Sequence, residues 1–450
     1  MSIEAVEPGH AAAAREVFNA MHAGRPDEVV SCKTADDVAA AIKHARAENL
    51  RVAVRAGGHS IAGLSAIEGG MLIDLAPMND VQVDPERKLA KVGGGAIWSE
   101  VDQATQAHGL ATPGGVVSDT GVAGLTLGGG YGWLRRKHGL SSDNVVEAEV
   151  VTADGSVLTA SADENPDLYW AIRGGGGNFG IVTSFTFALH PVGPEVAFSA
   201  TFYPIEEYAQ VLRGWRDYVE QAPDEVTTVC VGITFPANPE LPEAIHDRPV
   251  VIVGGVFVGD VEEGLQITAP LRELGTPLFD MSGPTPFVGV QTGFDPLFPR
   301  GQLRAYWKSQ YLNELSDGAI ETIAARAGDR PAPLTLLNVF AMGGAIAKVG
   351  EEDTAFATRE PLYMVSIDGM WSDAADDDAN VAWVRDTWNA VKEYGTGEVY
   401  LNFTGRADEA PDAGVDSALG RNMARLAEIK AKYDPDNFFR VNDNIAPASG

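Results

Sequence analysis

Cysteine is scarce in this sequence of 450 residues, and long apolar runs are missing. Only Cys32 and Cys230 occur, far apart and outside any CxxC pattern, so neither a disulfide framework nor a metal site is expected. No run of about 18 apolar residues is present, which argues against a membrane-spanning helix. The first ten residues lack the basic and apolar segments of a secretory signal, and we therefore expect a cytoplasmic protein.

Positive charge is also in deficit. The chain carries 33 Lys and Arg residues against 63 Asp and Glu residues, which gives a formal net charge of -30. Such a field repels nucleic acid and anionic lipid surfaces, and neither is expected as a partner. The acids are dispersed in small groups such as Asp376 to Asp378, which favours a solvated acidic surface. Attraction of a cationic substrate is the alternative reading of this charge.

The hydrophobic pattern divides the chain into three stretches. In the first, to about residue 190, the pattern predicts helices at 98–107 and 165–173 and strands at 51–55, 144–152, 156–160 and 181–189. In the second, to about residue 400, it predicts helices at 206–220, 261–274, 317–327 and 376–394, and strands at 226–235, 250–258, 306–312 and 363–370. This alternation is typical of one sheet with helices on one face. The third stretch contains a predicted helix at 418–432.

Four glycine-rich segments stand out in the first stretch: Arg55–Ser60, Pro113–Gly121, Gly128–Gly132 and Gly174–Gly180. Glycine clusters persist where φ must be positive or where a ligand approaches the main chain. Successive N–H groups in such turns can hold a pyrophosphate. Together the segments predict a large cofactor that carries phosphate groups.

A Rossmann dinucleotide fold matches these glycines poorly. No clear strand directly precedes Gly128–Gly132, and the G-x-G-x-x-G spacing is not met. Glu147 lies about 20 positions further on, as the acidic residue of that motif would, but its context is wrong. The cofactor is therefore expected in another fold.

The segment Arg-Ala-Gly-Gly-His-Ser at 55–60, after a hydrophobic strand, resembles the flavin attachment motif of the berberine bridge enzyme-like oxidases. Further segments similar to that family are Gly128–Gly132, Asp167–Gly180, Tyr400–Phe403 and Tyr433–Phe439. The resemblance implies an α+β fold of the vanillyl alcohol oxidase superfamily. It implies a two-part PCMH-type FAD-binding domain, residues 1–192 and 405–450, around a central substrate domain, residues 193–404, with an antiparallel sheet.

In that family, the histidine corresponding to His59 bonds to the 8α-methyl carbon of FAD. A neutral imidazole nitrogen attacks the quinone-methide tautomer of the flavin. Some members add a second bond through a cysteine, but Val117 occupies that position, so a single attachment is expected. The resemblance places these further residues around the cofactor: Arg55, Ala56, Gly57, Gly58, Ser60, Gly121, Gly124, Gly128, Gly129, Gly130, Gly132, Gly176, Gly180, Ile181, Val182, Tyr400 and Asn442.

Two further positions bear on the electron acceptor and on the catalytic base. Thr120 occupies the position that the resemblance associates with oxygen access, and its volume is close to that of valine, which favours an oxidase. Relatives that oxidise alcohols use the last residue of a Tyr-x-Asn-Tyr motif as base, but here that residue is Phe403, which cannot accept a proton.

Four other polar residues are the catalytic candidates. Tyr400 and Asn402 keep their matches to the family motif and are expected near the flavin. Tyr306 and Lys308 share one face of a predicted strand, although a purely structural strand is an equally good reading of that pair. The missing phenol makes CH–NH oxidation more credible than in relatives that keep it, because a neutral amine can release hydride without a base. Oxidation of a CH–OH donor remains open.

The expected function is an FAD-dependent oxidase that takes hydride from a small-molecule CH–OH or CH–NH donor and reduces O2 to H2O2. Two alternatives remain: a flavin dehydrogenase with another acceptor, and a flavin-binding protein without catalysis. The sequence carries no signal for an oligomeric state.

Overall fold

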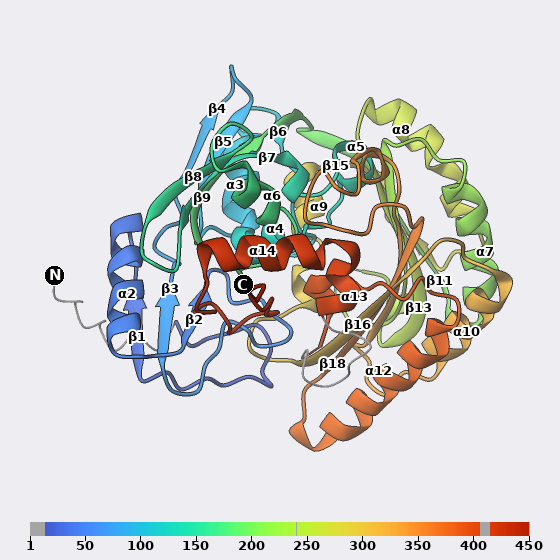
Figure 1. The fold of residues 1–450 in the computed structure, drawn as a ribbon. Coiled ribbons are helices and arrows are strands. Elements are labelled where there is room, and N and C mark those ends of the chain that lie inside the picture. The colour runs from blue at the N-terminus through green and yellow to red at the C-terminus, as the bar shows by residue number, and fades with distance from the viewer. Residues whose placement is uncertain (1–13, 240, 406–414, 450) are drawn as a thin grey trace.

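Two groups of sheets make up the protein, as seen in a computed structural model that describes residues 14–239, 241–405 and 415–449. In Figure 1 the earlier part of the chain lies on the left and a larger sheet lies on the right. The first ten residues, on which the expectation of a cytoplasmic protein rests, lie outside the described residues. So do residues 406–414 and 450 of the predicted C-terminal segment.

The first part contains a small parallel sheet and a five-stranded antiparallel sheet. The parallel sheet has the order β1-β3-β2 and packs against α2; their bounds are Glu28–Ser31, Met71–Asp74, Val52–Arg55 and Ala35–Ala47. The antiparallel sheet has the order β4-β5-β9-β7-β8, with bounds Val81–Asp84, Leu89–Gly93, Ile181–Ala188, Val145–Val151 and Val157–Ser161. The remaining elements are β6 (Leu110–Ala111), β10 (His190–Pro191), α3 (Trp98–Gln106), α4 (Val122–Leu127), α5 (Arg135–His138) and α6 (Pro166–Ala171).

Alternation along β9 explains how the antiparallel sheet packs. Phe185 and Phe187 point to the same face because they are two residues apart, and both are buried. The ring of Phe187 lies 6.0 Å from that of Trp98 at the start of α3. The helix therefore covers this face and completes the core of the first part.

The second part is built on an eight-stranded sheet whose paired strands are all antiparallel. Its order is β14-β11-β13-β12-β17-β18-β16, with bounds Phe279–Asp280, Glu195–Pro204, Arg248–Phe257, Val226–Phe235, Leu336–Ala341, Tyr363–Trp371 and Arg304–Leu312. A further strand, β15 (Gly283–Pro286), also pairs with β11. Its helices are α7 (Tyr208–Val219), α8 (Val261–Ile267), α9 (Phe287–Thr292), α10 (Asp317–Gly328), α11 (Ala345–Lys348) and α12 (Asp377–Lys392).

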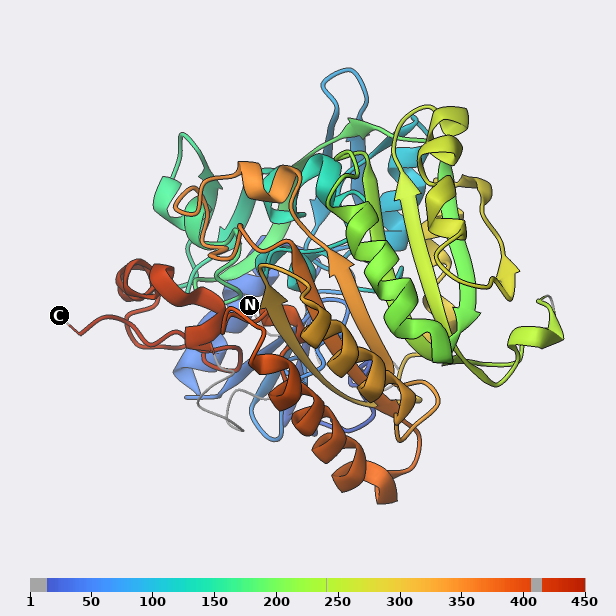
Figure 2. The ribbon, with the colours of Figure 1, turned by 90° about the vertical axis from the view of Figure 1, so that its right-hand side faces the viewer.

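The central strands of this sheet are buried on both faces. Helices α7, α10 and α12 cover one face, as Figure 2 shows in green, gold and orange. Cys230, Val339 and Ile367 pack with these helices, whereas Val229 and Trp307 belong to the core of the opposite face. That opposite face looks toward the first part, so its side chains are available for a site between the two parts.

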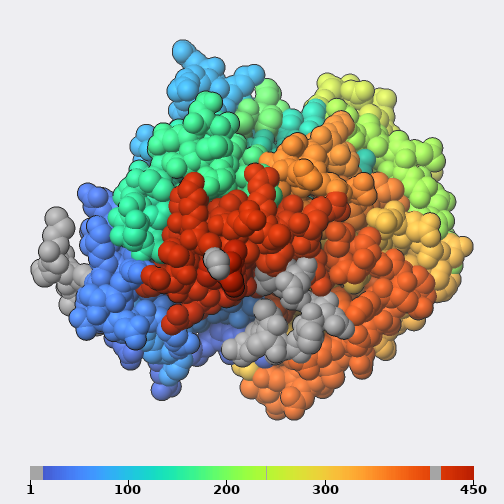
Figure 3. All heavy atoms as spheres, viewed as in Figure 1, coloured from blue at the N-terminus to red at the C-terminus, as the bar shows by residue number. Residues whose placement is uncertain are grey.

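The C-terminal segment returns to the first part of the chain. It contains α13 (Val415–Leu419) and α14 (Met423–Tyr433), and it crosses the surface between the two parts in Figure 3. Lys430 of α14 is fully buried, and its Nζ donates to Asp434 Oδ2 at 2.6 Å and to the carbonyl oxygens of Asn178 and Phe439, each at 2.8 Å. Burial lowers the pKa of Lys430, and Asp434 offsets that effect only in part.

The predicted α+β class and the antiparallel sheet are confirmed. The predicted helix at 261–274 is wrong in its second half, because Pro270 has no N–H to donate: α8 ends at Ile267 and a separate 3-10 helix spans Ala269–Arg272. No helix among the described residues is long and apolar enough to cross a membrane. The domain boundaries stay a prediction.

Lys430→Ala should destabilise the protein strongly, because it leaves the buried Asp434 carboxylate without its cation. Removing one partner of a buried ion pair costs roughly 3–5 kcal/mol. Lys432→Ala is the matched control: its ion pair with Asp167 is partly exposed and contributes about 0–1 kcal/mol. Thermal unfolding of both variants checks this, and equal unfolding midpoints would contradict the structural role of Lys430.

Candidate functional site

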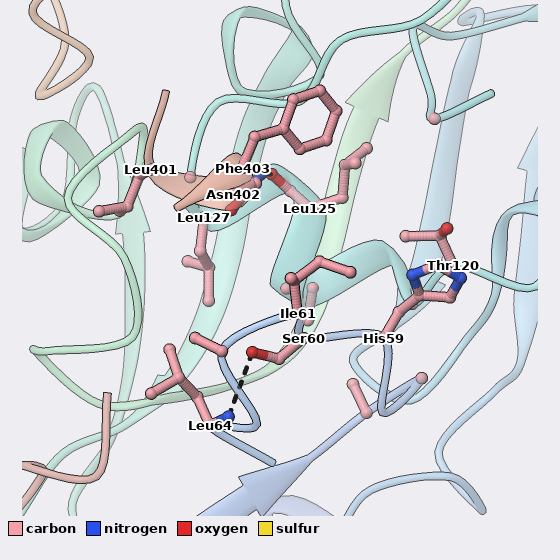
Figure 4. Close-up of a pocket in the computed structure, with 18 of the residues that line it drawn as sticks. His59, Ser60, Ile61, Leu64, Thr120, Leu125, Leu127, Leu401, Asn402 and Phe403 are labelled. Atoms are coloured by element: carbon pink, nitrogen blue, oxygen red, sulfur yellow. Dashed lines mark hydrogen bonds between the residues drawn. The ribbon is translucent and has the colours of Figure 1, made fainter. Parts of the chain in front are cut away.

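A cavity lies where the first part, the large sheet and the C-terminal segment meet. Its wall draws residues from the turn after β2 (within 56–65), from the stretch 115–135 and from the glycine segment and strand at 176–182. The large sheet contributes residues 229, 231, 307, 336, 338, 340 and 368, and the C-terminal region contributes residues within 401–404 and 439–443. Figure 4 shows part of this wall around His59, Thr120 and Asn402.

Two glycines fix the geometry at one end of the cavity. A Cβ at Gly57 would lie 2.3 Å from the nitrogen of Gly121, and a Cβ at Gly121 would lie 2.4 Å from the nitrogen of Gly57. Contacts below about 3 Å are not tolerated by packed atoms, so the two backbones cross where neither can carry a side chain. The crossing brings the turn after β2 against the start of α4.

His59 follows this crossing and is held from two sides. The ring of Phe18 stacks on the imidazole with centroids 4.1 Å apart and an interplanar angle of 15°. His59 Nε2 lies 3.1 Å from Asp119 Oδ1, and Arg300 Nε donates to Asp119 Oδ2 at 2.9 Å. Burial alone would raise the pKa of Asp119, but His59 and Arg300 outweigh it and hold that pKa below its usual range. Asp119 is therefore a carboxylate at neutral pH and orients the imidazole.

Glycines also leave room for a ligand along the wall. A Cβ at Gly124 in α4, or at Gly177, would meet no protein atom within 4 Å, and both residues line the cavity. At Gly128, by contrast, the side chain of Asn402 occupies the space, since a Cβ there would lie 2.2 Å from Asn402 Oδ1. Asn402 Nδ2 donates to the carbonyl oxygen of Leu125 at 3.0 Å, so this side chain ties the C-terminal region to α4.

The C-terminal segment closes another side of the cavity. Asn442 lines it and donates from Nδ2 to the carbonyl oxygen of Gly177 at 3.2 Å, while its Oδ1 is buried without a protein partner. Asp443 also lines the cavity, and burial raises its pKa to about 7. Asn178 Nδ2 donates to the carbonyl oxygen of Asp443 at 3.0 Å. These contacts place polar groups near the glycine segment.

The inner face of the large sheet forms the opposite wall. Its lining side chains are mainly apolar, and Trp307 packs edge-on against Phe403 with centroids 5.4 Å apart. Asp368 and Asn338 are the polar exceptions, and Asn338 Nδ2 donates to Asp368 Oδ2 at 2.6 Å. The indole nitrogen of Trp307 on this wall is buried without a protein partner, as is that of Trp133 in the stretch 115–135. This wall suits an apolar substrate with few polar groups.

Most of the residues predicted to hold the cofactor line the cavity. They are Ala56, Gly57, Gly58, His59, Ser60, Val117, Thr120, Gly121, Gly124, Gly128, Gly176, Gly180, Ile181, Val182 and Asn442, together with the catalytic candidate Asn402. Arg55, Gly129, Gly130, Gly132 and Tyr400 are not part of the wall.

These five residues contact or pack against other parts of the protein next to the cavity wall. Arg55 Nη1 donates to Asp74 Oδ1 at 2.8 Å, within the parallel sheet. A Cβ at Gly132 would lie 1.7 Å from the carbonyl oxygen of Gly114, so that glycine serves packing. Gly129 packs in the same way against Phe356. The Tyr400 hydroxyl accepts from the nitrogen of Gly130 at 3.1 Å.

Tyr400 is therefore a poor candidate for proton transfer. It is fully buried, its ring stacks on Tyr131 with centroids 4.0 Å apart, and burial raises its pKa. Its hydroxyl also accepts from Asn402 Nδ2 at 2.8 Å. The observed contacts fit a role in fixing Asn402 and the glycine segment.

Tyr306 and Lys308 do not line the cavity. They lie on the face of β16 that α12 covers: Arg385 Nε donates to the Tyr306 hydroxyl at 3.3 Å, and Lys308 Nζ lies 4.8 Å from the ring centroid of Trp388. The residue between them, Trp307, faces the cavity instead. The two-residue alternation of a strand correctly predicted that Tyr306 and Lys308 share one face. The structure does not support a catalytic role for either residue, because α12 covers that face.

Several lining residues were missed from the sequence. Asp368, Asn338, Trp307 and Asp443 belong to no recognisable motif, although Asp443 directly follows the predicted Asn442. The signal that could have found Asp368 is a lone acidic residue inside the otherwise uncharged strand Tyr363–Trp371.

Comparison with known proteins identifies the chain's relatives. Residues 26–161 match the family described as FAD binding domain, and residues 399–446 match the family described as berberine and berberine like. An uncharacterized FAD-linked oxidoreductase of Bacillus subtilis, YgaK, is 31% identical over 94% of this chain and 91% of its own length. Berberine bridge enzyme-like 17 of Arabidopsis thaliana is 30% identical over 94% of this chain and 85% of its own length.

A solved structure agrees over the whole chain. The crystal structure of 6-hydroxy-D-nicotine oxidase from Arthrobacter nicotinovorans matches with a TM-score of 0.87 and 26% identity, over 100% of this chain and 98% of the other. The fold and the cavity thus define an FAD-linked oxidoreductase with a PCMH-type fold. The chain belongs to the berberine bridge enzyme-like family, and the resemblance stated from its motifs is confirmed.

The residues of the cavity fit FAD. Gly124 and Gly177 leave open space beside the backbone, as close approach of a cofactor requires. Unpartnered buried polar atoms at the wall, on Ser65, Tyr131 and Asn442, are available to a polar ligand. Among the described residues, no group of three His, Cys, Asp or Glu side chains could hold a metal ion.

Gly124→Ala separates folding from cofactor binding. Alanine in α4 meets no protein atom and should stabilise the apoprotein by up to about 1 kcal/mol, because glycine is unfavourable inside a helix. The added methyl group occupies cavity space, so the content of bound FAD should fall. Gly328→Ala in α10 is the control, since it is equally open but outside the cavity. Full flavin content in Gly124→Ala, from the visible spectrum of purified protein, would contradict this placement of the cofactor.

Proposed function

We propose that this chain is an oxidase in which FAD is tethered to His59, with a small-molecule CH–OH or CH–NH compound as hydride donor and O2 as final acceptor. The observation that carries the proposal is the position of His59 at the cavity wall, beside the crossing of Gly57 and Gly121. When bound, FAD supplies the hydride acceptor. The donor loses one hydride and one proton, and O2 gains both electrons to become H2O2.

Three side chains support covalent attachment at this histidine. Phe18 and Asp119 fix the plane of the imidazole, and Asp119 occupies the side of Nε2, which leaves Nδ1 for the flavin. Arg300 holds Asp119 in place. A fixed, correctly oriented nucleophile lowers the entropic cost of forming the bond.

A single attachment fits the lining. Val117, which the family resemblance matches to the cysteine of the members with two flavin bonds, lies at the wall. Both cysteines of the chain, Cys32 and Cys230, lie outside the lining, and burial raises the pKa of each thiol. Neither is a reactive thiolate near the cavity.

Two features of the wall bear on the acceptor and the donor. Thr120 lies at the wall near His59, and the family resemblance associates a small residue there with oxygen access (Figure 4). Phe403 also lies at the wall, so the position that carries a phenol in alcohol-oxidising relatives has no group here to take a proton from an alcohol. A relative named (R)-6-hydroxynicotine oxidase is 29% identical, and one named monolignol oxidoreductase is 28% identical. These names are consistent with either an amine or an alcohol as the donor.

His59→Ala tests the tether. Wild-type protein that is precipitated with acid and washed should keep its yellow colour on the peptide that contains His59, and the variant should lose it while retaining some non-covalent FAD. His44→Ala, which changes an imidazole outside the cavity, should keep the colour. Mass spectrometry of the peptides gives the attachment site. A colourless wild-type pellet would remove the covalent part of the proposal.

Peroxide release tests the acceptor. A donor that bleaches the flavin without air should, with air, yield one H2O2 per donor oxidised. If the donor bleaches the flavin but turnover requires an artificial acceptor, the protein is a dehydrogenase. If no compound in a panel of alcohols, phenolics, sugars and amines bleaches it, the chain binds flavin without catalysing oxidation.

A further inference from the structure

One carboxylate lies in the substrate-side wall of the cavity. Asp368 of β18 is 4% exposed and lines the cavity, and its register partners are Trp307 on β16 and Leu336 on β17. Directly paired residues of neighbouring strands point to the same face, and both partners line the cavity as well. Asp368 is the only acidic residue that the large sheet contributes to the described lining.

Two hydrogen bonds hold this carboxylate in place. Asn338 Nδ2 donates to Oδ2 at 2.6 Å, and the Ser366 hydroxyl donates to Oδ1. Asn338 and Ser366 are themselves register partners on the same face. Burial raises the pKa of Asp368 to about 7, although both hydrogen bonds oppose that rise. The group can therefore gain and lose a proton near neutral pH, as a catalytic acid or base must.

The cation that lines the same cavity is engaged elsewhere. Arg135 is the only lysine or arginine in the described lining, and its guanidinium donates to the carbonyl oxygens of Ala341, Gly132 and Thr228. The other titratable groups of the described lining are His59, Tyr131 and Asp443. A carboxylate in an apolar wall is costly unless a cation pairs with it. An external cation would relieve this cost.

We propose that Asp368 binds the protonated nitrogen of an apolar amine substrate and accepts its proton, which deepens the proposed function and rests on it. In this step an N–H bond of the ammonium group breaks and an O–H bond forms on the carboxylate. The nitrogen lone pair is then free to assist loss of hydride from the α-carbon. Asp368 thereby takes over the proton transfer that Phe403 cannot perform.

The surroundings favour an amine over a sugar. Phe403, Trp307 and Phe340 offer apolar ring surfaces for a hydrocarbon substituent, and aromatic faces also attract a cation. A polyhydroxylated substrate needs a row of polar partners, whereas this sheet face offers Asp368, Asn338 and one indole N–H. The formal net charge of -30 draws cations toward the protein.

Asp368→Asn removes the charge and keeps the shape. The probes are 1-phenylethylamine and its neutral isostere 1-phenylethanol, applied without air to the flavin-loaded enzyme, with dissociation constants taken from the change in flavin spectrum and the concentration dependence of bleaching. The variant should bind the amine about 10- to 100-fold more weakly, the range lost with a charge-assisted hydrogen bond. Binding of the alcohol should change by less than about 2-fold, within the scatter of neutral contacts.

The pH dependence gives a second readout on the wild-type enzyme. Because the pKa of Asp368 is raised to about 7, the carboxylate is protonated below that pH, while the amine remains a cation there. Amine binding should therefore weaken as the pH falls below about 7, whereas alcohol binding should not. Asp368→Asn should abolish this acid limb. If that variant does not fold, the wild-type comparison of amine and alcohol decides alone.

Asp102→Asn is the matched control. Burial also raises the pKa of Asp102 to about 7, and Gln291 Nε2 donates to it at 3.0 Å, but it lies outside the cavity, so amine binding should be unchanged. The proposal is overturned if wild-type enzyme ignores the amine, or if Asp368→Asn keeps wild-type amine affinity. It is also overturned if the variant loses amine and alcohol equally. In each of these outcomes the acid-precipitation assay still tests the proposed function separately. That function fails if the wild-type protein is free of flavin.

Discussion

The backbone contact between Gly57 and Gly121 is the constraint on which the cavity depends. Because neither position can carry a side chain, the turn after β2 and the start of α4 approach as closely as two main chains can. His59 and Asp119 each lie two residues from this contact, which explains why the imidazole and the carboxylate meet at 3.1 Å. The direction of α4, and with it the open surface at Gly124, follows from the same crossing.

The cavity is complete only when the end of the chain has returned to the first part. Lys430 reaches the carbonyl oxygen of Asn178 across 252 residues, and Asn402 fills the space beside Gly128. Both contacts bind glycine segments, which have no side chains with which to hold their own conformation. The C-terminal region therefore stabilises the conformation of the glycine segments at the cofactor site. A local glycine motif alone would not form this site.

What could be predicted from sequence depended on whether the information was local. The strand Val226–Phe235 was predicted with its observed bounds, since its hydrophobic run has clear ends. His59 and Thr120 were placed by motifs, and both line the cavity. Strand alternation placed Tyr306 and Lys308 on one face, yet it could not tell which face α12 would cover. Asp368 belongs to no motif. Its position in the cavity wall depends on the register of three strands, β16, β17 and β18, which the local sequence does not specify.

Charge links the cofactor to the substrate. FAD carries an anionic pyrophosphate, yet the protein has a formal net charge of -30, and the one arginine of the described lining donates to backbone carbonyl oxygens. Backbone N–H groups of the glycine turns can supply partial positive charge for the pyrophosphate without side chains. A covalent bond at His59 would compensate for this weak electrostatic hold. The same negative field disfavours anionic donors, so a neutral or cationic donor is the one that such a protein can draw to a cavity whose sheet wall holds a buried carboxylate.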